Sequence, residues 1–186
     1  MILPIVGFGH DSLRRENQEV TPEYPDLDKL IENMYETMYE AQGVGLAAPQ
    51  VNIPLRMFIV DGTPAHPIGE EEDMTDFKQV FINPRMLKEH GEEWTFEEGC
   101  LSIPDIRENV SRKGTILIEY QDENFEKKTE TFDGMKARII QHEYDHLEGI
   151  LFTDHISSLR KRIVKPRLNK ISKGKISADY KMKFQE

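Results

Sequence analysis

The spacing of apolar residues predicts three helices. In the first, apolar residues recur at helical spacing after Pro25, with Asp26 as the expected N-cap and Gly43 as the expected stop. A second begins after Gly134 and runs from Met135 to about Leu147. We expect a third to be capped by Ser157, interrupted near Pro166 and stopped by Gly174. The apolar residues of the first helix, expected in the core, are Leu27, Leu30, Ile31, Met34, Tyr35 and Met38.

Between the first two helices the pattern favours strands. A turn near Asp122–Asn124 should join the last two strands into a pair. Residues 62–76 are rich in Pro, Gly and acidic residues, which predicts an exposed surface loop. The order of elements indicates an α+β fold. The expected strands are residues 55–61, 80–83, 109–121 and 124–132.

Composition narrows the class of protein. The 186 residues, 38% hydrophobic and 31% charged, are typical of a globular chain that folds as one domain. No apolar run is long enough to span a bilayer, so we expect no membrane contact. The opening MILPIVGFGH resembles neither a signal peptide nor a transit peptide, and a single cysteine suits a reducing compartment. We therefore expect a cytoplasmic protein.

The charge is unevenly distributed along the chain. Residues 160–186 hold ten Lys or Arg residues against Asp179 and Glu186, so this tail carries +8. The net charge of −10 then leaves −18 on residues 1–159. Two interpretations stay open: a solvated tail that softens the net charge, or an arm that meets nucleic acid. We expect residues 1–159 to form the catalytic domain, with the tail either part of it or appended.

The second helix carries a metal-binding pattern, His142-Glu143-Tyr144-Asp145-His146. Residues four apart lie on one face of a helix, so both imidazoles can reach one metal ion. Glu143 would then lie beside the metal, where it can take a proton from water. HExxH also occurs by chance, so the pattern alone is only moderately specific.

A third metal ligand is needed, and its identity separates the enzyme classes. The metzincin pattern requires a histidine at position 152, which is Phe152. The thermolysin-like pattern requires a downstream glutamate, and the basic stretch after His146 offers no obvious one. Upstream, Cys100 in Glu98-Gly99-Cys100-Leu101-Ser102 is the leading candidate. A thiolate with two imidazoles would leave a fourth position for water, whereas a closed structural site would need a fourth protein ligand.

A third motif is Gly43-Val44-Gly45-Leu46-Ala47-Ala48-Pro49-Gln50, whose glycines would let the backbone approach a ligand closely. Alone it is weak, since a Gly/Ala-rich helix end explains it equally well. In the order GxGLAAPQ, EGCLS and QHExDH, however, the three motifs together resemble the peptide deformylase family. The likeness runs from the N-terminal MILPIVGFG to about Ile156, and it includes Arg112 and Gln141.

The resemblance implies antiparallel or mixed sheets around a central HExxH-bearing helix, and a metal-dependent hydrolase that removes the formyl group from N-formylmethionyl nascent peptides. It implies Fe(II) as the native metal, replaceable by Zn, Ni or Co. By similarity, Gln50 and the backbone of Leu101 stabilise the oxyanion, Val44, Gly45 and Ile139 bind substrate, and an ion pair of Glu98 with Arg112 steadies Cys100. The assigned metal ligands are Cys100, His142 and His146, and the proton shuttle is Glu143.

Two alternatives remain beside this interpretation. A zinc endopeptidase would share HExxH, and an inactive deformylase-like binding protein would share all three motifs. The resemblance also raises a ribosome-docking role for the basic tail, against a strap that packs on its own acidic body.

Overall fold

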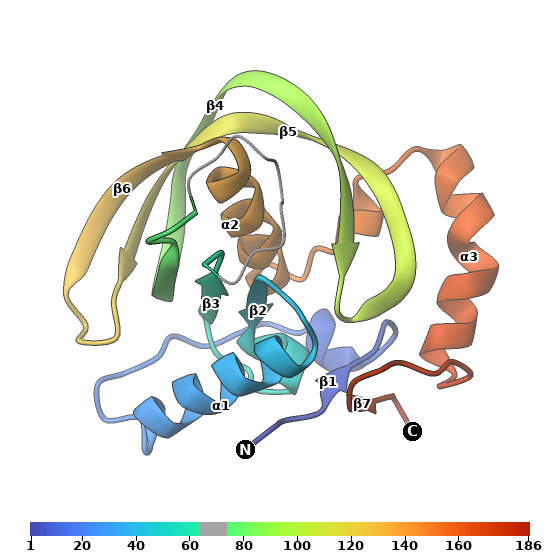
Figure 1. Cartoon of the computed structure of the whole chain (residues 1–186), viewed down its shortest axis with the longest axis horizontal. Helices are drawn as coiled ribbons and strands as arrows, with labels where there is room; N and C mark the ends of the chain where they lie inside the picture. The colour runs from blue at the N-terminus through green and yellow to red at the C-terminus, as the bar shows by residue number, and fades with distance from the viewer. Residues whose placement is uncertain (64–73) are drawn as a thin grey trace.

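The structure is a computed structural model, and it describes residues 1–63 and 74–186. A five-stranded antiparallel sheet, in the order β2-β3-β4-β5-β6, curves around the helix α2 (Figure 1). This arrangement confirms the α+β fold with a central helix. The other helices are α1 (Leu27–Glu40) and α3 (Ser158–Ser172), with 3-10 turns η1 (Asp11–Leu13), η2 (Ala48–Val51) and η3 (Phe152–Asp154). The sheet comprises β2 (Gly45–Ala47), β3 (Met57–Asp61), β4 (Lys78–Cys100), β5 (Ile103–Gln121) and β6 (Lys127–Asp133).

The long hairpin of β4 and β5 forms the arch over α2 (Figure 1). The predicted strand at residues 80–83 is only the beginning of β4, which continues to Cys100. Most of the added residues are exposed or half-buried and polar, so an apolar pattern could not reveal them. Cys100 pairs with Ile103 across a two-residue turn, and this places the cysteine at the tip of the hairpin.

The helix α1 confirms the predicted apolar stripe, which buries Leu30, Met34 and Met38. The cap differs from the prediction. Asp26 occupies the N-cap position, but its backbone is left-handed, with φ of 56°, and its side chain makes no capping hydrogen bond. The helix ends at Glu40, ahead of the expected stop at Gly43.

The helix α3 begins as predicted, since the Ser157 side chain accepts a hydrogen bond from the Arg160 N–H at 3.2 Å. The predicted interruption at Pro166 is wrong: the helix runs through it. Pro166 is on the exposed face, so water can reach the carbonyl that the missing N–H leaves unbonded. The opposite face buries Val164, Leu168 and Ile171 against the body, and the helix ends before Gly174, as predicted.

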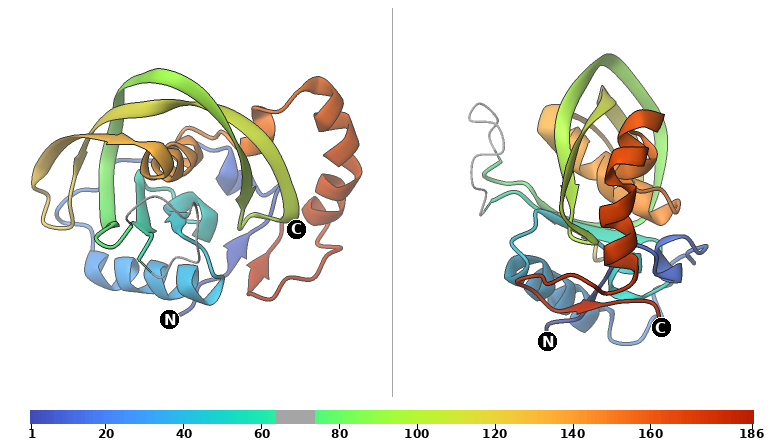
Figure 2. Two further views of the ribbon diagram at one scale, coloured as in Figure 1. Left: turned by 45° about the horizontal axis from the view of Figure 1, so that its top comes forward. Right: turned by 90° about the vertical axis from the view of Figure 1, so that its right-hand side faces the viewer.

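A second, parallel sheet joins the chain's two ends, β1 (Ile5–Val6) and β7 (Met182–Lys183), which lie on the same side of the molecule (Figure 2). The sequence pattern did not reveal either strand. Of the predicted loop at 62–76, residues 64–73 lie outside the described residues. Of its described residues, Thr63, Thr75 and Asp76 are exposed, as predicted, whereas Met74 is buried in the core. Within the described residues, no helix is long and apolar enough to cross a membrane.

Candidate active site

Three possible metal ligands meet beneath the arch of the hairpin. His142 and His146 lie one turn apart on α2, and Cys100 reaches them from the end of β4. One ligand atom from each residue lies within 4.8 Å of the other two, and Cys100 Sγ is 3.4 Å from His146 Nε2. A thiolate with two imidazoles suits a borderline-soft divalent ion, so the cluster fits a metal of that class.

Glu98 lies behind His142 and fixes its orientation. Its carboxylate oxygen is 2.9 Å from His142 Nδ1, which leaves Nε2 available as a ligand when Nδ1 carries the proton. Arg112 donates two hydrogen bonds to the same carboxylate, at 2.7 and 3.0 Å. Burial alone would raise the pKa of Glu98, but the hydrogen bonds from His142 and Arg112 hold that pKa below its usual range. The Glu98 carboxylate is therefore charged, and both of its oxygens form hydrogen bonds.

Two residues that the sequence analysis did not assign complete this network. Arg138, with only 2% of its surface exposed, donates to Glu98 at 2.7 Å and to the Val110 carbonyl at 2.8 Å. Asp145 accepts from Arg112 at 2.8 Å and so ties the network back to α2. The signal for Arg138 was present in the sequence: it lies four residues before His142 and therefore on the same helical face.

Glu143 is buried beside the possible ligands, and its Oε2 has no hydrogen-bond partner among the described residues. Burial raises the pKa of Glu143 to about 7. Gly45 makes the close approach possible, because a Cβ at that position would lie 2.6 Å from Glu143 Oε1. The carboxyl group is thus free to exchange a proton with a bound molecule.

Gln50 directs an amide toward the same point from η2. Its Oε1 accepts a hydrogen bond from the Ala47 N–H at 2.9 Å, which fixes the amide's orientation. Its Nε2 then lies 3.2 Å from Ser102 Oγ and 3.5 Å from Cys100 Sγ. A hydrogen-bond donor therefore faces the metal cluster.

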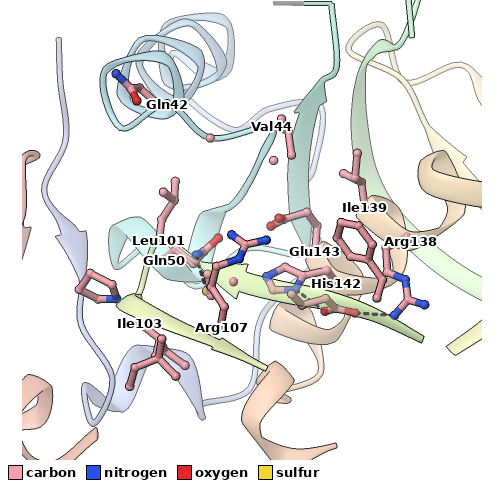
Figure 3. Close-up of a pocket in the computed structure, with 18 of the residues that line it drawn as sticks. Gln42, Val44, Gln50, Leu101, Ile103, Arg107, Arg138, Ile139, His142 and Glu143 are labelled. Carbon is pink, nitrogen blue, oxygen red and sulfur yellow. Dashed lines mark hydrogen bonds and ion pairs between the residues drawn. The ribbon is translucent and has the colours of Figure 1, made fainter. Parts of the chain in front are cut away.

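An open cleft of about 500 Å³ runs past these groups. Val44 and Ile139 lie at one end and Leu101 and Ile103 at the other, with Glu143 and His142 between them (Figure 3). Phe96 and Met135 add apolar surface to the lining. The structure thus brings all the predicted substrate and catalytic residues to one cleft, with Arg112 behind it.

A comparison with protein families decides the assignment. The model described as "Polypeptide deformylase" matches residues 2–162 of the chain. The chain belongs to the polypeptide deformylase family. The resemblance drawn from the three sequence motifs is thereby confirmed.

Relatives of known name agree with the family. The chain is 57% identical to a peptide deformylase of Flavobacterium johnsoniae, over 99% of this chain and 96% of the relative. It is 48% identical to one from Cytophaga hutchinsonii, over 99% and 98%. Among solved structures, a peptide deformylase from Thermotoga maritima shares 39% identity with a TM-score of 0.74, covering 84% of this chain and 99% of that one. One from Legionella pneumophila shares 32% with a TM-score of 0.78, covering 94% and 98%.

Deformylases are metal-dependent hydrolases that release the formyl group from the N-terminal formylmethionine of nascent polypeptides, and this is the activity of the chain. Membership of the family therefore favours deformylase activity over the two alternatives, a zinc endopeptidase and an inactive binding protein. The possible metal cluster agrees with the family's need for a metal.

The network around Glu98 generates the first prediction. Glu98→Gln should lower metal affinity tenfold or more, because His142 loses the carboxylate that orients it. It should also lower the melting temperature, since the buried Arg112 and Arg138 would each lose an ion pair, with Arg112 keeping the one to Asp145. Metal titration and thermal unfolding measure the two effects.

Glu97→Gln is the matched control, because Glu97 is the neighbouring glutamate and its side chain is 62% exposed. It should leave both quantities near those of the unaltered protein. Equal metal affinities for the two variants would contradict the role given to Glu98.

Proposed function

We propose that Cys100, His142 and His146 bind one divalent metal, and that Glu143 moves the proton during deformylation. The observation that carries this proposal is the buried Glu143 carboxyl group, whose Oε2 has no hydrogen-bond partner among the described residues, beside a cluster of three side chains that could bind a metal. A bound metal would supply Lewis-acid activation of water and of the formyl oxygen. We propose Fe(II) as the native ion, with Zn, Ni or Co as substitutes that the thiolate and imidazoles would also accept.

Glu143 acts twice in this mechanism. It accepts a proton from the water molecule as the water oxygen forms a bond to the formyl carbon. It then returns the proton to the nitrogen of methionine as the C–N bond breaks, which releases formate and a free amine. A pKa raised to about 7 by burial suits a group that must take up and release a proton near neutral pH. A divalent cation nearby would lower that pKa and favour the base form at the start of the cycle.

Two donors would stabilise the negative charge that develops on the formyl oxygen. One is the side-chain amide of Gln50, which η2 holds in place. The other is the backbone N–H of Leu101, which follows Cys100 at the tip of the β4–β5 hairpin. The hydrogen bond from the Ala47 N–H orients the Gln50 amide before substrate binds, which would reduce the reorganisation needed as the charge forms.

The substrate's methionine side chain would occupy the apolar end of the cleft. Ile139 and Val44 line that end, together with Met135. The edge of β2 is available for the peptide backbone, because among the described residues β2 is the first strand of the sheet and pairs with β3 alone. Gly45 in β2 could thus form strand-like hydrogen bonds with an extended nascent chain. Because such chains emerge from ribosomes, we infer that the protein works in the cytoplasm.

The role of Glu143 is tested by Glu143→Gln. This variant should retain its metal, and its turnover number should fall by about 10²–10⁴-fold, because the amide cannot accept a proton. Formate release from formyl-Met-Ala-Ser measures turnover, and metal analysis is made on the same sample. A casein substrate, which should remain intact, reports on endopeptidase activity. Loss of metal together with activity would show instead that Glu143 holds the ion.

Metal exchange tests the ligand set. With iron, activity should decay in air, because a thiolate ligand to Fe(II) is exposed to oxygen chemistry; with Ni or Zn it should persist. Mass spectrometry should locate the added oxygen on Cys100. Iron-loaded protein that stays fully active in air for days would argue against Cys100 as the ligand or against iron as the metal.

We also propose that the basic tail docks the enzyme on the ribosome. The helix α3 presents the basic residues Arg162 and Lys165 to solvent, next to the exposed apolar side chains of Leu159 and Ile163. Cations on one face and an acidic body on the other would orient the enzyme toward RNA phosphates. The strap alternative also has support, since Arg160 pairs with Glu108 at 2.6 Å.

Charge reversal distinguishes a tail that docks on the ribosome from a tail that only packs on its own acidic body. Truncation after Ser158 would remove the buried residues of α3 and confound the result with unfolding. Arg162→Glu with Lys165→Glu changes the exposed face alone, and should sharply reduce co-sedimentation with ribosomes at low salt while turnover on a free formyl tripeptide is unchanged. Lys127→Glu with Lys128→Glu, the same charge change on β6, is the control. Equal co-sedimentation of both double variants would support the strap.

A further inference from the structure

The chain that follows α3 turns back and is fastened along the N-terminal segment (Figure 2). The N–H groups of Ile5 and Gly7 donate to the carbonyls of Lys181 and Lys183, each at 2.9 Å. Further along, the Asp11 N–H donates to the side chain of Gln185 at 3.0 Å. Backbone pairing and the Gln185 side chain therefore hold the last residues of the chain along the N-terminal segment.

Packing locks the same segment. The ring of Phe184 lies directly over Gly7, where an added Cβ would come within 2.7 Å of two ring carbons. On its other side the ring faces Gly174, the left-handed glycine that follows α3. Phe184 joins the buried cluster that includes Val6 and Ile171. The path of the chain just before Phe184 is thereby fixed.

This path carries Tyr180 into the active-site cleft. Its side chain is half-buried and lines the cleft together with Gln42 and Pro104. Its hydroxyl donates a hydrogen bond of 2.7 Å to the Leu101 carbonyl. Tyr180 lies outside residues 2–162, the stretch that the family model matches.

The hydrogen bond reaches the turn on which the proposed mechanism depends. Leu101 and Ser102 form the tip of the β4–β5 hairpin, directly after Cys100. The Phe8 N–H donates to the Ser102 carbonyl at 2.8 Å, so both carbonyls of this turn are held by the two ends of the chain. The Leu101 side chain is held as well, since a Cβ at Gly43 would lie 2.8 Å from it.

The cleft's geometry also indicates where a peptide leaves the active site. A peptide that pairs with the edge of β2 can extend in two directions. Leu46 and Ala47 are fully buried, whereas Gln42 is exposed, so the open direction leads past Gln42. Tyr180 lines the cleft and bonds to Leu101, which lies at the end opposite Val44 and Ile139.

We infer that Tyr180 is a positioning and specificity-determining residue: its hydroxyl holds the Leu101–Ser102 turn in place, and its ring forms the wall against which the peptide residues after methionine pack. The inference rests on the proposed function of Cys100 and Leu101 and deepens it. The hydroxyl acts through the turn and touches no reacting atom. The ring acts on the substrate itself, beyond the methionine.

The roles inferred for the Tyr180 hydroxyl and for its ring predict different kinetic changes. Tyr180→Phe removes the hydroxyl and keeps the ring, so kcat should fall about fivefold on every formyl peptide while KM stays within about twofold. Tyr180→Ala removes both, so KM should also rise, by about tenfold for formyl-Met-Ala-Ala-Ala and little for formyl-Met amide. Tyr24→Phe is the control, because Tyr24 is another half-buried tyrosine that does not line the cleft.

A second measurement does not depend on turnover. Calorimetric binding of the deformylated peptides Met-Ala-Ala-Ala and Met amide to metal-loaded protein should show weaker binding of the longer peptide to Tyr180→Ala only. Metal content and melting temperature are recorded for each variant. A purely structural role would lower these two together and would not depend on peptide length.

The results of these experiments distinguish a failure of the inference about Tyr180 from a failure of the proposed function on which it rests. If the unaltered protein releases formate and Tyr180→Phe matches it in kcat, the positioning role is overturned. If Tyr180→Ala raises KM equally for the long and short peptides, the wall is overturned. A failure of the unaltered, metal-loaded protein to release formate would overturn the proposed function and this inference with it.

Discussion

The buried carboxylate of Glu98 is the interaction on which the rest of the site depends. It receives hydrogen bonds from Arg112 and Arg138 and fixes the ring of His142, all within a region that water hardly reaches. Removing such charges from water costs several kcal/mol for each ion, and mutual attraction offsets that cost only when the geometry satisfies every donor. The network is therefore weak evidence for added stability. We propose that its role is to set one orientation of His142, a proposed metal ligand.

The network also joins two parts of the chain that are distant in sequence, the β4–β5 hairpin and the helix α2. Glu98 and Cys100 lie two residues apart at the end of β4, while Arg138 and His142 lie one turn apart on α2. The contacts of Glu98 with Arg138 and His142 thus link the hairpin to the helix at the level of the cluster. The bond of Arg112 to Asp145 adds a second link, from β5 to the same helix. The distance between Cys100 and the two histidines is consequently set by rigid elements and not by a loop.

The sequence allowed much of this site to be predicted, because its chemistry is local. The spacing of His142 and His146 on a helix, and the neighbours of Cys100, needed no tertiary information.

The parts that could not be predicted depend on contacts between distant segments. The extension of β4 from residue 83 to Cys100 lacks an apolar pattern, because most of the strand lies over the helix with polar residues outward. Tyr180 gave no signal at all, since only the pairing of β7 with β1 brings it to Leu101. Pro166 was misjudged because exposure, which decides its cost, is a tertiary property.

Glu143 shows how the fold maintains a group that opposes its own stability. A buried carboxyl oxygen without a hydrogen-bond partner costs free energy, and burial raises its pKa to about 7. The surrounding contacts hold Glu143 in place despite this cost. Glu98 fixes the neighbouring His142, and Arg112 fixes the helix through Asp145. Opposite the carboxyl group, the absence of a side chain at Gly45 leaves the space that Glu143 occupies. The ion-pair network around Glu98 and the Glu143 carboxyl group are thus complementary: the network supplies the rigidity that keeps Glu143 in place for the proton transfer proposed for it.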